Sequence, residues 1–110
     1  MRCYFADDLL LMLPLSAGPG VRLRGEVLGS HRGPLALALT DEAARTDEIV
    51  LDLTDVSFVS SSILQALALI ASRLAPSQCL IIRASAELGL RERTAAYGWD
   101  RIATLCLLET

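Results

Sequence analysis

The stretch from residue 48 to residue 74 constrains the fold most, because it joins a strand pattern to a helix pattern through three consecutive serines. Residues 49–53 form a short, apolar and partly β-branched run that is typical of a buried strand, and residues 54–55 predict a turn after it. Further along, apolar residues follow one face of an amphipathic helix: Leu64, Leu67, Ala68, Ala71 and Leu74. We therefore expect a strand, a serine turn at residues 60–62 and a helix.

Strand patterns also occur on both sides of this stretch. Residues 9–15 form an apolar run with Pro14 near its end, which indicates an edge position. Residues 21–27 alternate apolar and charged side chains, and the intervening Gly/Pro turn predicts a hairpin between the two strands. Residues 79–83 predict another short buried strand, whereas residues 102–108 fit either a helix or a strand.

Two more helices are expected. The first covers residues 34–45, with Pro34 in its first turn, although residues 41–42 leave a separate turn as an alternative. The other covers residues 85–97, where an initial serine provides an N-cap and Gly98 follows the last residue.

Strands that alternate with helices predict an α/β fold in which the mid-chain strands pair in parallel. The initial hairpin makes the sheet mixed. We expect one domain over residues 1–110, with a four- to five-stranded sheet and helices packed mainly on one face.

Composition excludes several classes of protein. The net charge is −3, the ten basic residues are all arginines, and no basic stripe occurs, which argues against nucleic-acid binding. No apolar run approaches the roughly 20 residues of a membrane span, so we expect no membrane insertion. Six acids against one arginine in residues 41–55 predict a solvated face, or a surface that complements a basic partner.

The cysteines and the N-terminus favour a cytoplasmic location. Cys3, Cys79 and Cys106 are odd in number and form no CxxC pair, so neither a disulfide framework nor a zinc site is indicated. They suit small buried hydrophobic residues in a reducing compartment, Cys79 best of all. Asp7 and Asp8 interrupt any signal-peptide apolar segment.

No residue pattern predicts catalysis or a cofactor. His31 is the single histidine and lies in a Gly/Ser loop, where we expect it to be solvated. The serines lack a GxSxG context and an activating base, and no glycine loop matches a nucleotide-binding pattern. An enzyme is not expected; a small-molecule sensor near Cys3 or His31 rests only on the presence of those residues.

The serine turn permits a structural and a functional interpretation. Ser62 and Gln65 fit a capping box, in which the serine oxygen accepts from the Gln65 N–H and the glutamine reaches back. One cap does not require three serines. Phosphorylation of an exposed serine at a helix N-terminus adds negative charge where the helix dipole tolerates it, so the turn also suits a switch.

Residues 51–64 resemble the STAS domain of bacterial anti-sigma-factor antagonists, whose pattern is a strand with "LDL" followed by "F-[IVM]-D-S-[ST]-G-L". Residues 23–27 resemble the family's "L-x-G-E-[LIV]-D" strand, and residues 98–102 its "G-[LF]-D-x-[LIF]" motif. Order and spacing agree over about residues 21–105.

The resemblance implies a small mixed sheet without enzymatic activity or cofactor. It implies that the unphosphorylated domain binds an anti-sigma factor with a kinase fold, and that phosphorylation of one serine ends the binding. That serine corresponds to Ser61, with Ser60 and Ser62 as lesser candidates, and the partner surface includes residues 60–63 (Ile63 among them) and Gln65.

Three positions depart from the family pattern: Ser60 replaces the aspartate, Ile63 the glycine, and Leu28 the aspartate of the first motif. The loss of the aspartate and the glycine favours an alternative, a STAS adaptor subunit of a transporter or sensory complex that works without phosphorylation. Nothing in the sequence indicates the oligomeric state.

Overall fold

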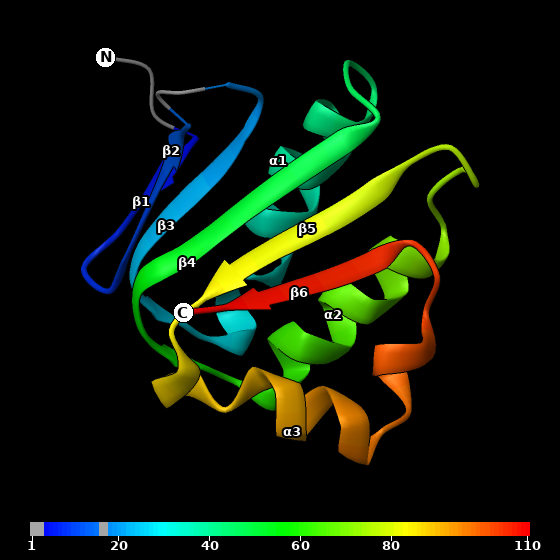
Figure 1. The fold of residues 1–110 in the computed structure, drawn as a ribbon. Helices are drawn as coiled ribbons and strands as arrows, with labels where there is room; N and C mark the ends of the chain where they lie inside the picture. The colour runs from blue at the N-terminus through cyan, green and yellow to red at the C-terminus, as the bar shows by residue number, and fades with distance from the viewer. Residues whose placement is uncertain (1–3, 16–17) are drawn as a thin grey trace.

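A six-stranded sheet forms the centre of the molecule, and its strands lie in the order of the chain (Figure 1). The computed structural model describes residues 4–15 and 18–110. The strands are β1 (Phe5–Ala6), β2 (Leu10–Pro14), β3 (Gly20–Val27), β4 (Glu48–Val59), β5 (Cys79–Ala84) and β6 (Leu105–Glu109). β1, β2 and β3 pair antiparallel, whereas β3 to β6 pair in parallel. The mixed sheet and the hairpin are confirmed.

The sheet has six strands, whereas four to five were expected. The additional strand, β1, is only two residues long, which is too short to show an alternation of apolar and polar residues in the sequence. The segment that fitted either a helix or a strand ends in β6, preceded by a 3₁₀ turn at Trp99–Arg101. β2 is not an edge strand, since β1 pairs with it, but β1 reaches only Leu11 and Met12 and leaves Pro14 opposite β3 alone.

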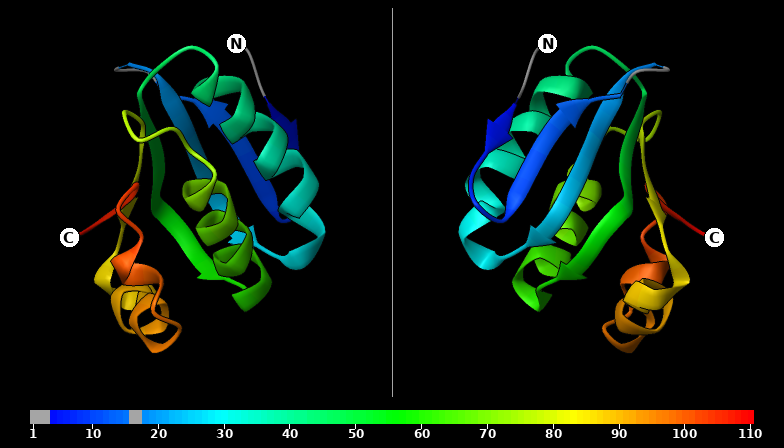
Figure 2. Two further views of the ribbon diagram at one scale, coloured as in Figure 1. Left: turned by 90° about the vertical axis from the view of Figure 1, so that its right-hand side faces the viewer. Right: turned by 90° about the vertical axis from the view of Figure 1, so that its left-hand side faces the viewer.

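Parallel strands need crossover connections, and two helices supply them. α1 (Arg32–Ala43) and α2 (Ser61–Ser72) lie side by side on one face of the sheet (Figure 2), as expected. α1 starts two residues before Pro34, which falls in the first turn where its missing N–H costs nothing. α1 continues through Asp41 and Glu42, so no separate turn forms there.

The core lies between the sheet and these two helices. Its fully buried side chains come from every layer: Leu23, Leu35, Leu39, Ile49, Leu51, Leu53, Ile63, Leu67, Leu80 and Leu90. α1 and α2 have 12 residues each, fewer than the roughly 20 of a membrane span, and no helix of the described chain qualifies as one.

β4 corrects the expected turn at Thr54 and Asp55, because the strand runs unbroken from Glu48 to Val59. Its register against β3 shifts twice. β4 has one extra residue, a β-bulge, between Asp52 and Asp55 and a second between Val56 and Phe58. Such bulges spoil the period of two that identifies a strand. They explain why Thr54 and Asp55 resembled a turn in the sequence.

The segment after β5 also differs from its expectation. Ser85 does cap, accepting the Glu87 N–H at 3.2 Å, but the turn that it caps is a 3₁₀ turn at Ala86–Leu88. Gly89 then adopts a left-handed conformation (φ 64°), and α3 (Leu90–Ala96) begins after it. Gly98 is left-handed too (φ 74°) and follows the helix end as predicted.

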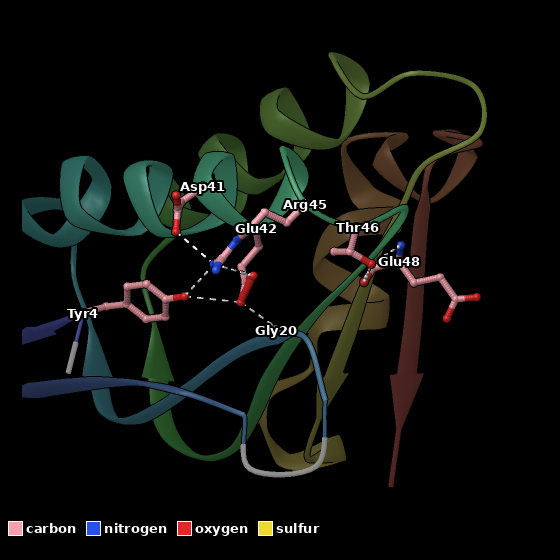
Figure 3. A network of polar contacts seen from close by, with 7 residues as sticks. All are labelled: Tyr4, Gly20, Asp41, Glu42, Arg45, Thr46 and Glu48. Atoms are coloured by element: carbon pink, nitrogen blue, oxygen red, sulfur yellow. Dashed lines mark hydrogen bonds and ion pairs between the residues drawn. The ribbon is translucent and has the colours of Figure 1, made fainter. Parts of the chain in front are cut away.

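Glu42 corrects the expectation that the acids of residues 41–55 are all solvated, because it is only 5% exposed. Its Oε1 accepts from the Gly20 N–H (3.0 Å) and the Tyr4 hydroxyl (3.3 Å), and its Oε2 pairs with Arg45 Nη2 at 2.9 Å (Figure 3). Asp41 holds the same guanidinium from outside at 3.0 Å. This network ties α1 to the β1 end of the sheet.

His31 was expected to be solvated, yet it is 1% exposed. Its Nδ1 accepts from the Leu28 N–H at 2.9 Å, so the ring donates from Nε2 to Asp7 Oδ2 at 2.7 Å. Asp7 also accepts from the N–H groups of Leu9 and Leu10. A Gly/Ser loop suggested solvent, but Nδ1 bonds within the loop to Leu28 and Nε2 fixes the loop to the β1–β2 turn at Asp7.

The cysteines follow their prediction only in part. Cys79 is half-buried, and burial raises the pKa of its thiol, whereas Cys106 is exposed. Cys3 lies outside the described residues.

Candidate functional site

The serine turn joins the end of β4 to α2, and Ser60 is the residue that fixes it. Its backbone is extended (φ −71°, ψ 156°), and its Oγ accepts from the Ile63 N–H at 3.4 Å, which makes it the N-cap of α2. Its N–H donates to the Val27 carbonyl at 2.9 Å, and its own carbonyl accepts from the Leu64 N–H at 3.2 Å. Ser60 therefore anchors the turn to both β3 and α2.

The capping box at Ser62 and Gln65 was wrong, because the helix begins one residue before Ser62. Ser62 lies inside the first turn, and its Oγ is 3.1 Å from Ser60 Oγ. It points toward Gly29, where a Cβ would lie only 2.9 Å from Ser62 Oγ. Gln65 is exposed on the next turn of α2, away from the helix start.

Ser61 is the exposed member of the trio and the first residue of α2. Within residues 4–15 and 18–110, its hydroxyl has no hydrogen-bond partner, whereas Ser60 and Ser62 bond to each other. Ile63 points the other way and is 1% exposed, so its side chain belongs to the core and is not available at the surface of the turn.

Arg93 holds the strand that leads into the turn. Its Nη2 donates to the Val59 carbonyl at 2.7 Å from α3. β5 ends at Ala84, opposite Leu53, so it no longer pairs with this part of β4. No local signal in the sequence identifies this contact, because it is made across 34 residues.

The electrostatics of the turn suit an added negative charge. α2 contains no charged residue from Ser61 to Ser72, and its N-terminus presents N–H groups and the positive end of the helix dipole. Arg93 supplies a guanidinium close to the same point. A phosphate on Ser61 would meet no acidic residue of α2.

Asp52 and Asp55 were interpreted as turn or capping acids, and neither lies at the serine turn. Asp52 Oδ1 accepts from the Thr54 N–H at 2.9 Å and its hydroxyl at 2.6 Å. Asp55 pairs with Arg22, whose hydrogen bond lowers the pKa of the carboxyl. Across the described chain, no three His, Cys, Asp or Glu residues are grouped as metal ligands.

Tyr97 is an exposed aromatic residue, with 62% of its surface accessible. Its ring stacks on Trp99 with the centroids 4.5 Å apart. This pair lies beyond α3 and does not reach the serines.

Comparisons with known proteins agree with the resemblance seen in the sequence. The family model described as "Mlab, STAS domain" matches residues 15–109. The crystal structure of an anti-sigma factor antagonist from Mycobacterium paratuberculosis superposes with a TM-score of 0.73 at 23% identity, covering 92% of this chain and 88% of that chain. No curated protein matches the chain.

The family match covers most of the sequence, from β3 through the bulged strand and the serine turn to β6. The structural match reproduces the mixed sheet with its helices. The chain therefore belongs to the STAS domain family and has the fold of an anti-sigma factor antagonist.

Proposed function

We propose that this domain is a non-enzymatic regulator that binds an anti-sigma factor with a kinase fold through the serine turn, and that phosphorylation of Ser61 ends the binding. One observation carries the proposal: Ser61 is exposed and unpartnered in the described structure, whereas the cap and its bonds occupy Ser60 and Ser62. The cytoplasm of a bacterium is the compartment that such a partner implies. The free thiols of Cys79 and Cys106 are compatible with it.

The chemistry of the switch follows from the position of Ser61. A phosphate adds about −1.5 to −2 charges at neutral pH. At the first residue of α2 that charge meets the positive end of the dipole, so the domain stays folded. A partner docked over the turn must desolvate the new charge, which weakens binding.

The test uses a kinase-fold anti-sigma factor with ATP. We expect a mass increase of about 80 Da on the wild type that maps to Ser61, because among the three serines of the turn its hydroxyl is the free one. Ser61→Ala abolishes the increase, and Ser62→Ala, the matched neighbour, retains it. Ser61→Asp binds the partner more weakly than the wild type does. Unmodified wild type together with unchanged binding by Ser61→Asp removes the switch.

The second candidate is a phosphorylation-independent adaptor subunit of a transporter or sensory complex. It is favoured by the loss of the family aspartate, because Ser60 stands at that position and serves as the N-cap of α2. It is also favoured by Ile63, which is buried where the family has a glycine. Retrieval of transporter components by both wild type and Ser61→Asp, without an anti-sigma factor, decides for the adaptor.

A further inference from the structure

A groove of about 430 Å³ lies between α1 and α2, on the side of the helices that faces away from the sheet. Its floor and walls are mostly apolar, with Ala36 on α1 and Ala66, Leu69 and Ile70 on α2. Leu69 is 41% exposed and adds apolar surface to this wall. Figure 2 shows the two helices next to each other on the same face of the sheet.

The charge along this groove is of one sign. Although the chain is net −3, the charged residues that line the groove are Arg32 and Arg73. Neither arginine has an acidic partner among the residues that the structure describes. An apolar centre with unpaired cations at its rim has the composition of an interface for an acidic partner.

The two arginines lie at opposite ends of the groove. The helices start together, because Ser62 of α2 touches Gly29 just before α1. They also end together, because Gln78 after α2 donates to the Ala43 carbonyl at 2.7 Å. Arg32 is the first residue of α1 and Arg73 follows the last residue of α2. Eleven residues of α1 separate the ends, which is about 16 Å along the axis.

We propose that this groove binds an amphipathic α-helix of a partner protein that carries acidic residues about three turns apart. A small anion would require clustered cations, whereas these are a groove length apart. An extended peptide would require a free sheet edge, which two helices do not offer. The small side chains of Ala36 and Ala66 let a third helix approach at the usual 8–10 Å.

A second copy of the chain is a poorer occupant. α1 has an acid on its exposed side, Asp41, but Arg45 of the same helix already holds it at 3.0 Å. Two-fold packing of this face on itself would place the basic groove rims of both copies together. Ser61 does not line the groove, so the proposal does not depend on the function proposed for the serine turn.

The experiment uses two synthetic helical peptides of about 15 residues with identical Leu/Ala faces, one with glutamates and one with lysines near both ends. Fluorescence anisotropy of the full chain is expected to show the glutamate peptide binding about tenfold tighter than the lysine peptide. The double variant Arg32→Glu/Arg73→Glu reverses that preference. Thr40→Trp, on the exposed rim of the groove, fills it and abolishes binding of both peptides.

Two matched controls retain wild-type binding: Leu37→Ser, an exposed apolar residue of α1 outside the groove, and Arg83→Glu, an exposed arginine of β5. The proposal is overturned by equal affinity for the two peptides, by binding that survives Thr40→Trp, or by no binding up to about 1 mM. Dimerisation that Thr40→Trp abolishes would replace the partner helix with a second copy. Binding to anionic vesicles, without binding to either peptide, would replace it with a lipid surface.

Discussion

At the scale of single residues, the three consecutive serines have different structural roles. Ser60 caps the helix with its side chain and backbone, and Ser62 bonds to Ser60 from within the first turn. The Ser61 hydroxyl makes no hydrogen bond to the described residues. The division follows from helix geometry, since successive residues point about 100° apart. A stability measurement can therefore separate the structural serine from the free one.

We expect Ser60→Ala to destabilise the domain by about 0.5–1 kcal/mol, the low end of an N-cap loss because the cap hydrogen bond is long at 3.4 Å. Ser61→Ala should change the free energy of unfolding by less than about 0.5 kcal/mol. Ser60→Asp should retain the cap. Urea denaturation of the three variants checks this, and equal effects of the two alanine substitutions would contradict the assignment.

At the scale of elements, buried polar groups fix how the N-terminal strands and α1 meet. Two such groups lie in segments where the sequence predicted solvent, His31 in a Gly/Ser loop and Glu42 in an acidic run. In both cases the side chain bonds to a residue far away in the sequence, the Asp7 carboxylate for His31 and the Gly20 N–H for Glu42. Contacts of this kind leave no local pattern.

Glu42→Leu should destabilise the domain by about 1–3 kcal/mol, because the Gly20 N–H is left buried without an acceptor. Glu42→Gln keeps an oxygen that accepts from Gly20 and should lose less. Asp41→Asn, on the exposed side of the same guanidinium, is the control and should have little effect. Chemical denaturation of the three variants provides the comparison, and a ranking with Asp41→Asn lowest in stability would exclude the network as a fold determinant.

The Asp7 carboxylate makes part of the stability depend on pH. The hydrogen bond from the Leu9 N–H, and then that from His31, lowers the pKa of Asp7 in the folded state below its usual value of 3.8. A carboxyl whose pKa is lowered by folding stabilises the fold at pH values above its unfolded-state pKa. This contribution is lost as the pH falls through the folded-state pKa. Asp7→Asn should therefore lose less stability than the wild type when the pH is lowered from about 6 to about 3. The pH series is measured in steps of about one unit.

The exposed Asp100 lacks a partner among the described residues, so Asp100→Asn serves as the control. Its stability should depend on pH as that of the wild type does. Urea midpoints across the pH series give the comparison. An unchanged acid sensitivity in Asp7→Asn would show that the remaining carboxylates, such as Asp55 with its pKa lowered by Arg22, account for it.

At the scale of the whole molecule, the sequence predicted the layers and the pairing but not the details at the site. The alternation in residues 21–27 and the apolar runs at residues 49–53 and 79–83 are local signals, and they identified β3, β4 and β5. The bulges that extend β4 to Val59 depend on its register with β3, so the sequence of β4 alone suggested a turn. The correct cap, Ser60, was missed because Ser62 with Gln65 matches the capping-box pattern, whereas Ser60 is followed at that spacing by Ile63.

The two halves of β4 have different neighbours, and this difference places the serine turn at the least supported end of the central strand. Residues 49–53 pair with β3 on one side and β5 on the other. The last residues, ending at Val59, pair with β3 alone across two register shifts. On the side that β5 leaves open, Arg93 donates to the Val59 carbonyl. α3 thus replaces the missing strand with one guanidinium, and the position of the turn depends on it.

Arg93→Gln should therefore loosen the end of β4 without loosening its centre. Loss of one charge-assisted hydrogen bond at a half-buried site is worth about 1 kcal/mol, which makes amide exchange in residues 56–60 about fivefold faster. Amides of residues 49–53 should keep their wild-type rates, because their opening requires the whole sheet to unfold. Arg91→Gln, on the same helix as Arg93, removes an ion pair with Glu109 of β6 and should change neither set. Hydrogen exchange followed by NMR resolves the two halves, and equal acceleration in both would mean that Arg93 supports the fold as a whole rather than the strand end that carries Ser61.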